Sequence, residues 1–259
     1  MLNQYTNPVK RAMAEGKATL GSWLQSCSPV MAEILAEAGF DWLLIDMEHS
    51  PLGLETLVSI IQAMKGTAAV PFVRAPWNDF VTIKRILDCG TYGIIVPYVN
   101  TREEAERAVA ACKYPPAGIR GIAGSPRGND YGATKERLKV ISEEICVITQ
   151  IETPAAAANI DDLLTVDGVD GFFIGPMDLS TSMGHFADPS HPEVQKTIRA
   201  LEEKVLPSGK FLGTLTSSME QAEELFRRGY QFVTVMSDTT SLGAMARERV
   251  NRFRTLGLG

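Results

Sequence analysis

Eight short, almost uninterrupted apolar runs recur along the chain, with helical patterns between them. Continuous apolar runs indicate parallel strands that are covered on both faces, whereas half-solvated strands alternate apolar and polar residues. We therefore predict parallel strands at Leu20–Leu24, Trp42–Asp46, Val70–Arg74, Gly93–Val99, Cys146–Ile151, Gly171–Ile174, Phe211–Leu215 and Phe232–Met236.

The segments between these runs carry the signals that begin and end helices. One helix begins with an N-cap at Ser28, has proline in its first turn and ends at Gly39. Another opens at Thr101, where Glu104 can complete a capping box. Further helices are predicted at Gly53–Lys65, Asp79–Cys89, Lys135–Glu144, Pro154–Leu164, Pro192–Leu206, Ser218–Arg228 and Ser241–Arg254.

Eight strands, each followed by a helix, fit a closed α/β (β/α)8 TIM barrel better than an open doubly wound sheet. No G-x-G-x-x-G motif follows the first strand, which argues against a dinucleotide-binding fold. No linker or low-complexity segment interrupts the 259 residues, an ordinary length for one barrel. We predict a single domain over residues 1–259.

The charge and composition exclude several classes of partner. A net charge of −6 argues against general affinity for nucleic acid or anionic membranes. No apolar run approaches the roughly 20 residues that span a bilayer, and the first ten residues lack the apolar core of a signal peptide. Four scattered cysteines without a C-x-x-C pair indicate reduced thiols and no cysteine metal site. We expect a cytoplasmic protein.

Two carboxylates directly follow neighbouring predicted strands. Glu152 comes after the fifth strand and Asp178 after the sixth. Carboxylates at adjacent strand ends can bind one hard divalent cation and leave its other positions to water or substrate. The alternative is that each acid only caps a helix or lies in its first turn. Their matched placement favours the metal interpretation.

One histidine, His49, follows directly on a strand, whereas His185 and His191 lie in a loop rich in Gly, Asp, Pro and Ser and are expected to be solvated. A lone histidine is more often structural than a catalytic base. Asp88 changes this balance, because a carboxylate that accepts a proton from the ring would raise its basicity. The sequence does not show whether His49 and Asp88 meet.

The third strand ends in Arg74, where a guanidinium can hold an oxyanion or pair with a loop acid. No lysine lies at the carboxyl end of a predicted strand, which disfavours imine chemistry, and no Walker-type loop is present. The glycine-rich segment Gly118–Gly132 is either a lid that carries Arg120 and Arg127 towards an anionic substrate or an ordinary surface loop.

Several motifs occur together and in order over most of the chain, from about Gly21 to Arg254. They are L-L-I-D-M-E-H-S-P, P-F-V-R-A-P-W-N-D, K-Y-P-P-A-G-I-R-G, Q-I-E-T, G-V-D-G-F-F-I-G-P-M-D-L-S and a late D-T-T. With these motifs the chain resembles the HpcH/HpaI aldolase family. The resemblance implies a phosphoenolpyruvate/pyruvate-type TIM barrel and a class II, metal-dependent pyruvate aldolase of the 4-hydroxy-2-oxoheptanedioate or 2-keto-3-deoxy-sugar-acid type.

The resemblance also implies a role for each matching residue. Glu152 and Asp178 would bind the cation, which is expected to be Mg²⁺ or Mn²⁺, with Co²⁺ as a further candidate. Gln150 and the backbone of Met177 and Asp178 would contact pyruvate. The remaining matches are Arg74 for the enolate oxygen, His49 as the base, Asp88 as its partner and Asp46 as a nearby aspartate with a less defined role.

The expected reaction is reversible aldol cleavage of a 4-hydroxy-2-oxo acid to pyruvate and an aldehyde through a metal-stabilised enolate. Relatives usually form homohexamers, as trimers of dimers that exchange their last helix, and the amphipathic Ser241–Arg254 segment is compatible with this. Met47 and Met177 replace smaller residues of many relatives, which affects the expected pocket size. The alternatives are an acyl-CoA lyase of the citrate-lyase-β type and a non-catalytic metabolite-binding barrel.

Overall fold

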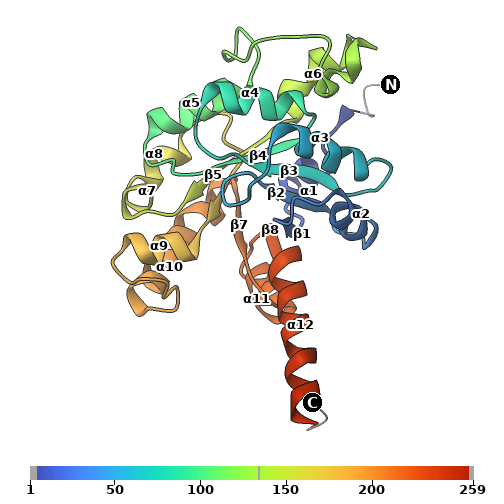
Figure 1. Cartoon of the computed structure of the whole chain (residues 1–259). Coiled ribbons are helices and arrows are strands. Elements are labelled where there is room, and N and C mark those ends of the chain that lie inside the picture. Colours follow the sequence, from blue (N-terminus) through green and yellow to red (C-terminus); the bar gives the residue numbers. More distant parts are fainter. Residues whose placement is uncertain (1–4, 134, 257–259) are drawn as a thin grey trace.

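The computed structural model describes residues 5–133 and 135–256 and confirms a closed parallel barrel in which the strands follow chain order and β8 pairs with β1. Helices surround this barrel (Figure 1). The strands are β1 (Thr19–Leu24), β2 (Trp42–Asp46), β3 (Val70–Arg74), β4 (Gly93–Val96), β5 (Cys146–Ile151), β6 (Gly171–Ile174), β7 (Phe211–Leu215) and β8 (Phe232–Ser237).

Most of the predicted helices form close to their predicted bounds. The segment predicted as one helix at Pro154–Leu164 is divided at Asn159, whose ψ of 9° departs from helical geometry. The helices are α1 (Pro8–Ala14), α2 (Pro29–Glu37), α3 (Leu54–Ala63), α4 (Phe80–Asp88), α5 (Arg102–Cys112), α6 (Glu136–Glu144), α7 (Pro154–Ala158), α8 (Ile160–Leu164), α9 (Pro176–Ser182), α10 (Pro192–Val205), α11 (Met219–Arg227) and α12 (Asp238–Thr255), with 3-10 turns η2 (Arg127–Gly132) and η3 (Leu206–Ser208).

Aromatic rings fill much of the barrel interior, and four of them are registered against a glycine on a neighbouring strand. The pairs are Gly21 with Trp42, Gly93 with Phe72, Gly171 with Phe211, and Gly213 with Phe232. The Trp42 and Phe232 rings stack with centroids 3.5 Å apart. A Cβ at any of these glycines would overlap the ring or the backbone of its aromatic partner. The large side chains therefore fit only because the facing positions have none.

A second apolar layer lies between the outer face of the barrel and the helices. The outward-facing residues of the strands, such as Leu43, Ile45 and Val73, pack there against buried side chains of the helices. At the amino end of the barrel, Val9 and Met13 of α1 join the interior cluster. Helix α1 thus closes the amino end of the barrel. Polar side chains that face open loops are therefore expected at the opposite, carboxyl end.

The seam between β1 and β8 joins the two ends of the sequence. The pairing of these strands is irregular between Gly21 and Trp23. Just beyond β8, the buried carboxylate of Asp238 accepts the backbone N–H groups of Gln25, at 2.8 Å, and Ser26, at 3.1 Å. This carboxylate thus accepts two backbone N–H groups that lie just beyond the end of β1.

Helix α12 extends away from the barrel (Figure 1). Within its described residues only Asp238 is buried. Apolar side chains along the rest of the helix are exposed, among them Leu242, Met245, Phe253 and Leu256. The helix therefore contributes little to the core of its own chain.

The glycine–aromatic packing gives a stability prediction. Replacing Gly21 with Ala should lower the free energy of unfolding by about 1–3 kcal/mol, because the added methyl group overlaps the fully buried Trp42 ring. Gly124→Ala is the matched control, since a Cβ there meets nothing within 4 Å and the change should stay within about 0.5 kcal/mol. Urea unfolding of the two variants measures this, and equal midpoints would contradict the packing argument.

Candidate active site

The polar site lies at the carboxyl end of the barrel and continues the inward-facing register of its strands. Side chains alternate between the two faces of a strand, so Trp42 and Leu44 inside the barrel place Asp46 on the inside as well. The same alternation places Arg74 after Phe72 and Gln150 after Ile148. Each of the three polar side chains is buried.

A two-point ion pair between Asp46 and Arg74 is the centre of the site. Arg74 donates from Nε to Oδ1 at 3.0 Å and from Nη2 to Oδ2 at 2.7 Å. Asp46 also accepts Gln25 Nε2 at 2.9 Å and the backbone N–H groups of Glu48 and His49. Burial raises the pKa of the Asp46 carboxyl, but the Arg74 hydrogen bonds and charge, with those of Gln25 and the His49 amide, leave the pKa below its usual value. The carboxylate thus stays ionised and fixes the guanidinium.

The third guanidinium nitrogen of Arg74 faces a second carboxylate. Its Nη1 lies 2.9 Å from Oε2 of Glu48, and the guanidinium carbon lies 4.4 Å from the centre of the Trp23 ring. Burial raises the pKa of Glu48, Arg74 lowers it, and Asp46 and Asp178 raise it again, so that the net shift is upward.

Sequence reasoning gave no role to Glu48, Gln25 or Trp23. Extending the inside–outside alternation of the first strand by one step would have placed Gln25 beside Trp23 on the inside of the barrel. Glu48 lies beyond the second strand, in a loop, where this periodicity no longer applies.

Glu152 directly follows β5 and is almost completely buried. Its Oε1 accepts the backbone N–H of Tyr98 at 2.7 Å, and its Oε2 accepts the side-chain amide of Gln150. Burial raises the pKa of Glu152 to about 7; the Tyr98 bond opposes this shift, and the negative charges of Glu48 and Asp178 add to it. The Arg74 charge also lowers this pKa, but burial and the two carboxylates outweigh it.

Asp178 lies in the first turn of α9, directly after β6, and is partly buried. The preceding Gly175 lies close to the Glu152 side chain, because a Cβ there would come within 3.3 Å of Glu152 Oε2. Gly175 caps α9 without a side-chain hydrogen bond. The N–H groups of Met177 and Asp178 lie in the first turn of α9, have no hydrogen-bond acceptor within the described chain and are available to a ligand.

These residues fit a divalent cation. The negative charge of Asp178 raises the pKa of both Glu48 and Glu152, and Glu48 also raises that of Glu152. The positive charge of Arg74 lowers the pKa of both glutamates. Hard divalent cations prefer such carboxylate oxygens. Gln150 Oε1 is also buried without a hydrogen-bond partner in the described part of the chain, and it leaves one more oxygen for a ligand.

His49 lies at the open side of the site, with its side chain 59% exposed and its Nε2 3.8 Å from Glu48 Oε2. Asp88, the carboxylate suggested as its partner, lies elsewhere in the chain. Helix α4 runs from the carboxyl end of β3 back towards the start of β4, so its last residue, Asp88, lies towards the amino end of the barrel. No hydrogen bond or ion pair joins the two residues in the described structure; Asp88 pairs with Arg120 at 2.9 Å.

The Gly118–Gly132 segment lies with Asp88 and not at the carboxyl end, so a lid role is not supported. Arg120 is 1% exposed, pairs with Asp88 and stacks on the Tyr114 ring. Arg127 donates to the carbonyl of Cys89, next to Asp88. Both arginines thus hold the loop against the body of the protein.

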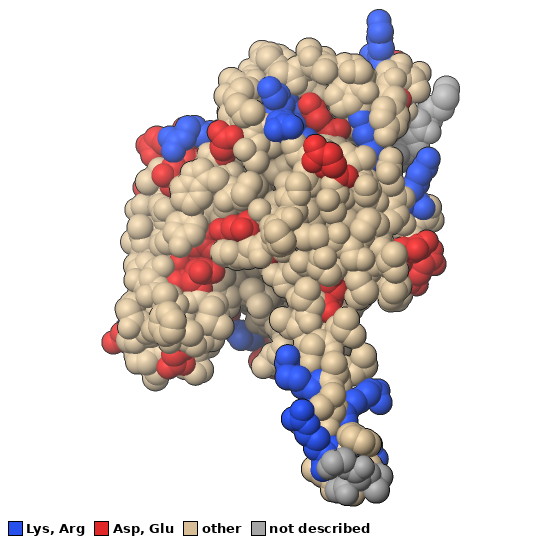
Figure 2. Space-filling model, viewed as in Figure 1, with Lys and Arg blue, Asp and Glu red and all other residues tan. Residues whose placement is uncertain are grey.

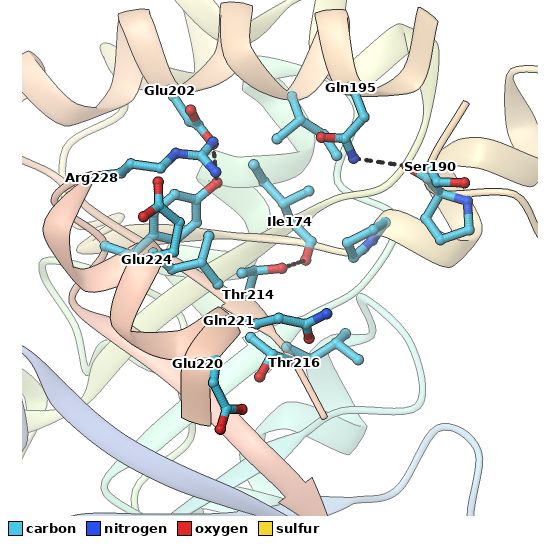
Figure 3. Close-up of a pocket in the computed structure, with 16 residues that line it drawn as sticks. Ile174, Ser190, Gln195, Glu202, Thr214, Thr216, Glu220, Gln221, Glu224 and Arg228 are labelled. Atoms are coloured by element: carbon cyan, nitrogen blue, oxygen red, sulfur yellow. Dashed lines mark hydrogen bonds and ion pairs between the residues drawn. The ribbon is translucent and has the colours of Figure 1, made fainter. Parts of the chain in front are cut away.

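A separate cavity of about 580 Å³ lies between α10 and α11, on the helix side of β6 and β7 (Figure 3). Its walls include Ile198 and Leu225, and at one side Glu202 bonds both Arg228 and the Tyr230 hydroxyl. Glu220 and Glu224 also line this cavity, and none of the residues predicted from the sequence to form the site does.

In residues 5–133 and 135–256, no helix combines the length and the apolar character that crossing a bilayer requires.

Comparison with known proteins gives concordant results. The family described as HpcH/HpaI aldolase/citrate lyase matches residues 19–244. A 5-keto-4-deoxy-D-glucarate aldolase of Salmonella paratyphi C is 39% identical over 250 residues, which cover 96% of this chain and 98% of the relative.

Two solved structures extend this likeness. An HpcH/HpaI aldolase/citrate lyase family protein from Burkholderia cenocepacia is 30% identical with a TM-score of 0.92, covering 96% of this chain and 100% of the other. The citrate synthase SbnG is 27% identical with a TM-score of 0.86, covering 97% and 99%.

The raised pKa of Glu152 predicts how stability depends on pH. Between the ordinary value of 4.5 and about 7, the folded carboxyl holds a proton that the unfolded chain has released. Stability from this group therefore falls as pH rises through that range. In the presence of EDTA, the melting temperature of Glu152→Gln relative to wild type should rise from pH 4.5 to pH 7 and then level off. Thermal unfolding with Glu223→Gln, an exposed acid, as control measures this; a constant difference would contradict the assignment.

Proposed function

The chain belongs to the HpcH/HpaI aldolase/citrate lyase family and is an aldolase, a carbon–carbon lyase, and we propose that it cleaves a 4-hydroxy-2-oxo acid reversibly to pyruvate and an aldehyde. The name of the Salmonella relative supports a keto-deoxy sugar acid as the substrate class. The observation that supports the proposal is that Glu152, Asp178 and Arg74 all lie at the carboxyl ends of strands, and that the charges of Asp178 and Arg74 both act on the Glu152 carboxyl. This is the end at which barrel enzymes carry their chemistry.

We propose that Glu152 and Asp178 hold a divalent cation, Mg²⁺ or Mn²⁺, with Co²⁺ as a further candidate. When bound, the cation supplies positive charge that stabilises the negative charge developing on the 2-oxo acid. Two protein carboxylates leave most of the coordination positions of such an ion to substrate and water. The raised pKa of Glu152 supports this role: burial is its main cause and the charges of Glu48 and Asp178 add to it, and a bound cation would offset both effects.

The protein groups around this position divide the remaining tasks. Arg74, held by Asp46, is preorganised to stabilise an oxyanion without moving. The Gln150 side chain and the free N–H groups of Met177 and Asp178 would orient the pyruvate end of the substrate. His49 at the open side would remove the proton of the C4 hydroxyl as the C3–C4 bond breaks. The bond's electron pair passes to the pyruvate part, whose C3 later takes up a proton, and C4 leaves as the aldehyde carbon.

The role proposed for Asp88 requires a second copy of the chain. Within one chain Asp88 pairs with Arg120 towards the amino end of the barrel, whereas His49 lies at the carboxyl end and is exposed. If Asp88 raises the basicity of His49, it does so across a subunit interface. In the single chain, the carboxylate nearest to His49 is that of Glu48.

We also propose that α12 packs on a neighbouring subunit, in a hexamer built as a trimer of dimers. The exposed Leu242, Met245, Phe253 and Leu256 on a helix outside the body support this. Figure 2 shows Lys and Arg side chains gathered along the protruding helix, which carries Arg247, Arg249, Arg252 and Arg254 in its last turns. An apolar strip flanked by arginines suits a protein surface with acidic groups.

The likeness to a citrate synthase supports a second candidate, in which the same site forms or breaks a C–C bond with a thioester such as acetyl-CoA. A third possibility, a non-catalytic barrel, is disfavoured because the acids, Arg74 and His49 are all present. Calorimetric binding of acetyl-CoA separates the second candidate from the first.

Pyruvate alone tests the first candidate without knowledge of the aldehyde. The wild-type protein with Mg²⁺ or Mn²⁺ should exchange the methyl protons of pyruvate in D₂O, as followed by NMR, and EDTA should stop the exchange. Glu152→Gln should slow it by about 100-fold or more, the scale of losing an electrostatic stabiliser, whereas the exposed Glu223→Gln should leave it unchanged. No exchange by folded, metal-loaded protein would refute pyruvate as the nucleophilic half.

His49 is tested by the aldol cleavage itself. His49→Ala should lower kcat for cleavage by about 10²–10⁴-fold, the range for loss of a general base, and should not abolish metal binding. Unchanged cleavage in this variant would exclude His49 as the base.

The packing of α12 predicts the oligomeric state. Replacing both Phe253 and Leu256 with Asp should shift the protein to smaller species. Both exposed apolar side chains lie at the end of the protruding helix, where a charge would oppose its packing on a neighbouring subunit. Sedimentation measures the mass, with Val30→Asp, an exposed apolar position on α2, as a comparison. A wild-type monomer would contradict the exchanged helix.

A further inference from the structure

The segment between α9 and α10 brings the two remaining histidines of the chain together with a glutamate. Nitrogen atoms of His185 and His191 and a carboxylate oxygen of Glu193 all lie within 4.8 Å of one another. The two imidazole rings stack with centroids 3.4 Å apart and planes 14° apart. The sequence had suggested that both rings are solvated, but the structure leaves them only partly exposed.

We propose that His185, His191 and Glu193 bind a transition-metal ion of the Zn²⁺ type, at a site separate from Glu152 and Asp178. The proposal rests on the donor set and its geometry and does not depend on the proposed aldolase chemistry. Two imidazole nitrogens and one carboxylate oxygen form a ligand set that Zn²⁺ commonly takes, with a fourth position for water.

The distances suit an ion after a small adjustment. Nε2 of His185 lies 2.9 Å from Oε2 of Glu193. Two ligand atoms of a tetrahedral ion with bonds of about 2.0–2.1 Å lie roughly 3.3 Å apart, so this pair needs to open by only a few tenths of an ångström. The Glu193 side chain is 70% exposed and can make this movement, whereas His185 is 22% exposed and is held more firmly.

The backbone holds both histidines in place before any ion binds. The His185 N–H donates to the carbonyl of Ser180, at the end of α9, and the His185 carbonyl accepts the N–H of Asp188. The Asp188 carbonyl in turn accepts the N–H of His191, which is the N-cap of α10. The backbone that carries both histidines is therefore ordered before an ion binds, and only side chains need to move.

Two features oppose binding and limit the affinity. The two imidazole rings stack almost in parallel, so their in-plane nitrogen lone pairs do not converge and one ring must turn to bind the same ion. His191 Nδ1 accepts the backbone N–H of Glu193 at 3.3 Å, which in a neutral ring places the proton on Nε2. A metal ion at either nitrogen must displace this bond or shift the tautomer. We therefore expect a dissociation constant on the order of micromolar, weaker than a fully preformed zinc site.

The donor chemistry separates this site from the one at the barrel end. Imidazole nitrogen suits Zn²⁺, Ni²⁺ and Cu²⁺, whereas Mg²⁺ and Mn²⁺ prefer the oxygen ligands of Glu152 and Asp178. A bound ion would connect the loop that follows α9 to the start of α10. The first turn of the same α9 carries Asp178.

Zn²⁺ titration of the full chain, prepared without a polyhistidine tag, tests the proposal. The titration is performed by calorimetry on wild type with excess Mg²⁺ and on Glu152→Gln, which removes the other proposed site. One Zn²⁺ per chain should bind to Glu152→Gln. Adding His185→Ala or His191→Ala should weaken this binding by at least about tenfold, whereas adding His49→Ala, which removes the third histidine, should not change it.

Two further measurements exclude trivial outcomes. Zn²⁺ should raise the melting temperature of Glu152→Gln, and this rise should vanish in the His185 and His191 variants. Their metal-free melting temperatures show whether the variants still fold, and His185→Gln replaces any variant that does not. Absence of Zn²⁺ binding, or binding that persists undiminished in both histidine variants, would overturn the proposal.

Discussion

The fit of aromatic rings into the spaces left by glycines is the constraint on which the barrel depends. Each of the four rings faces a glycine on a neighbouring strand, and this pairing holds only in one register. A shift of one residue would turn the inward-facing side chains of a strand outward. The register that buries Trp42 is therefore also the one that turns Asp46 inward, and the register of Phe72 does the same for Arg74. Interior packing and the polar site are specified together.

The charge balance of the site follows from this placement. Arg74 is shared between Asp46 and Glu48, which leaves Glu152 and Asp178 without a positive partner of their own. Burial without such a partner raises the pKa of Glu152, while the paired Asp46 moves in the opposite direction. Two carboxylates that are both buried thus differ in chemical character, because one has a guanidinium within hydrogen-bonding distance and the other has amide donors only.

The strands and the barrel could be predicted from the sequence because continuous apolar runs leave few alternatives. Glu152, Arg74 and Asp178 could also be placed, since Arg74 ends a predicted strand and the two acids come shortly after one. Whether His49 and Asp88 meet could not be judged from residue types. The answer depends on the direction of α4, which carries Asp88 away from the carboxyl end. The contact of Tyr98 with Glu152 could not be predicted for another reason. Tyr98 donates its backbone N–H to the Glu152 carboxylate from a conformation with φ of 53°, and the type of side chain gives no signal for such a contact.

The β1–β8 seam has a consequence for how the chain acquires its structure. The contacts of Asp238 with Gln25 and Ser26 join positions more than 200 residues apart. Such long-range contacts carry a high loop-closure cost and are slow to form. During synthesis, the first strand is made early, but its partner on one side is the last strand to leave the ribosome. Until then the edge of β1 remains an open template for pairing with other chains, so the nascent protein is most vulnerable to aggregation in the interval before its final helix begins.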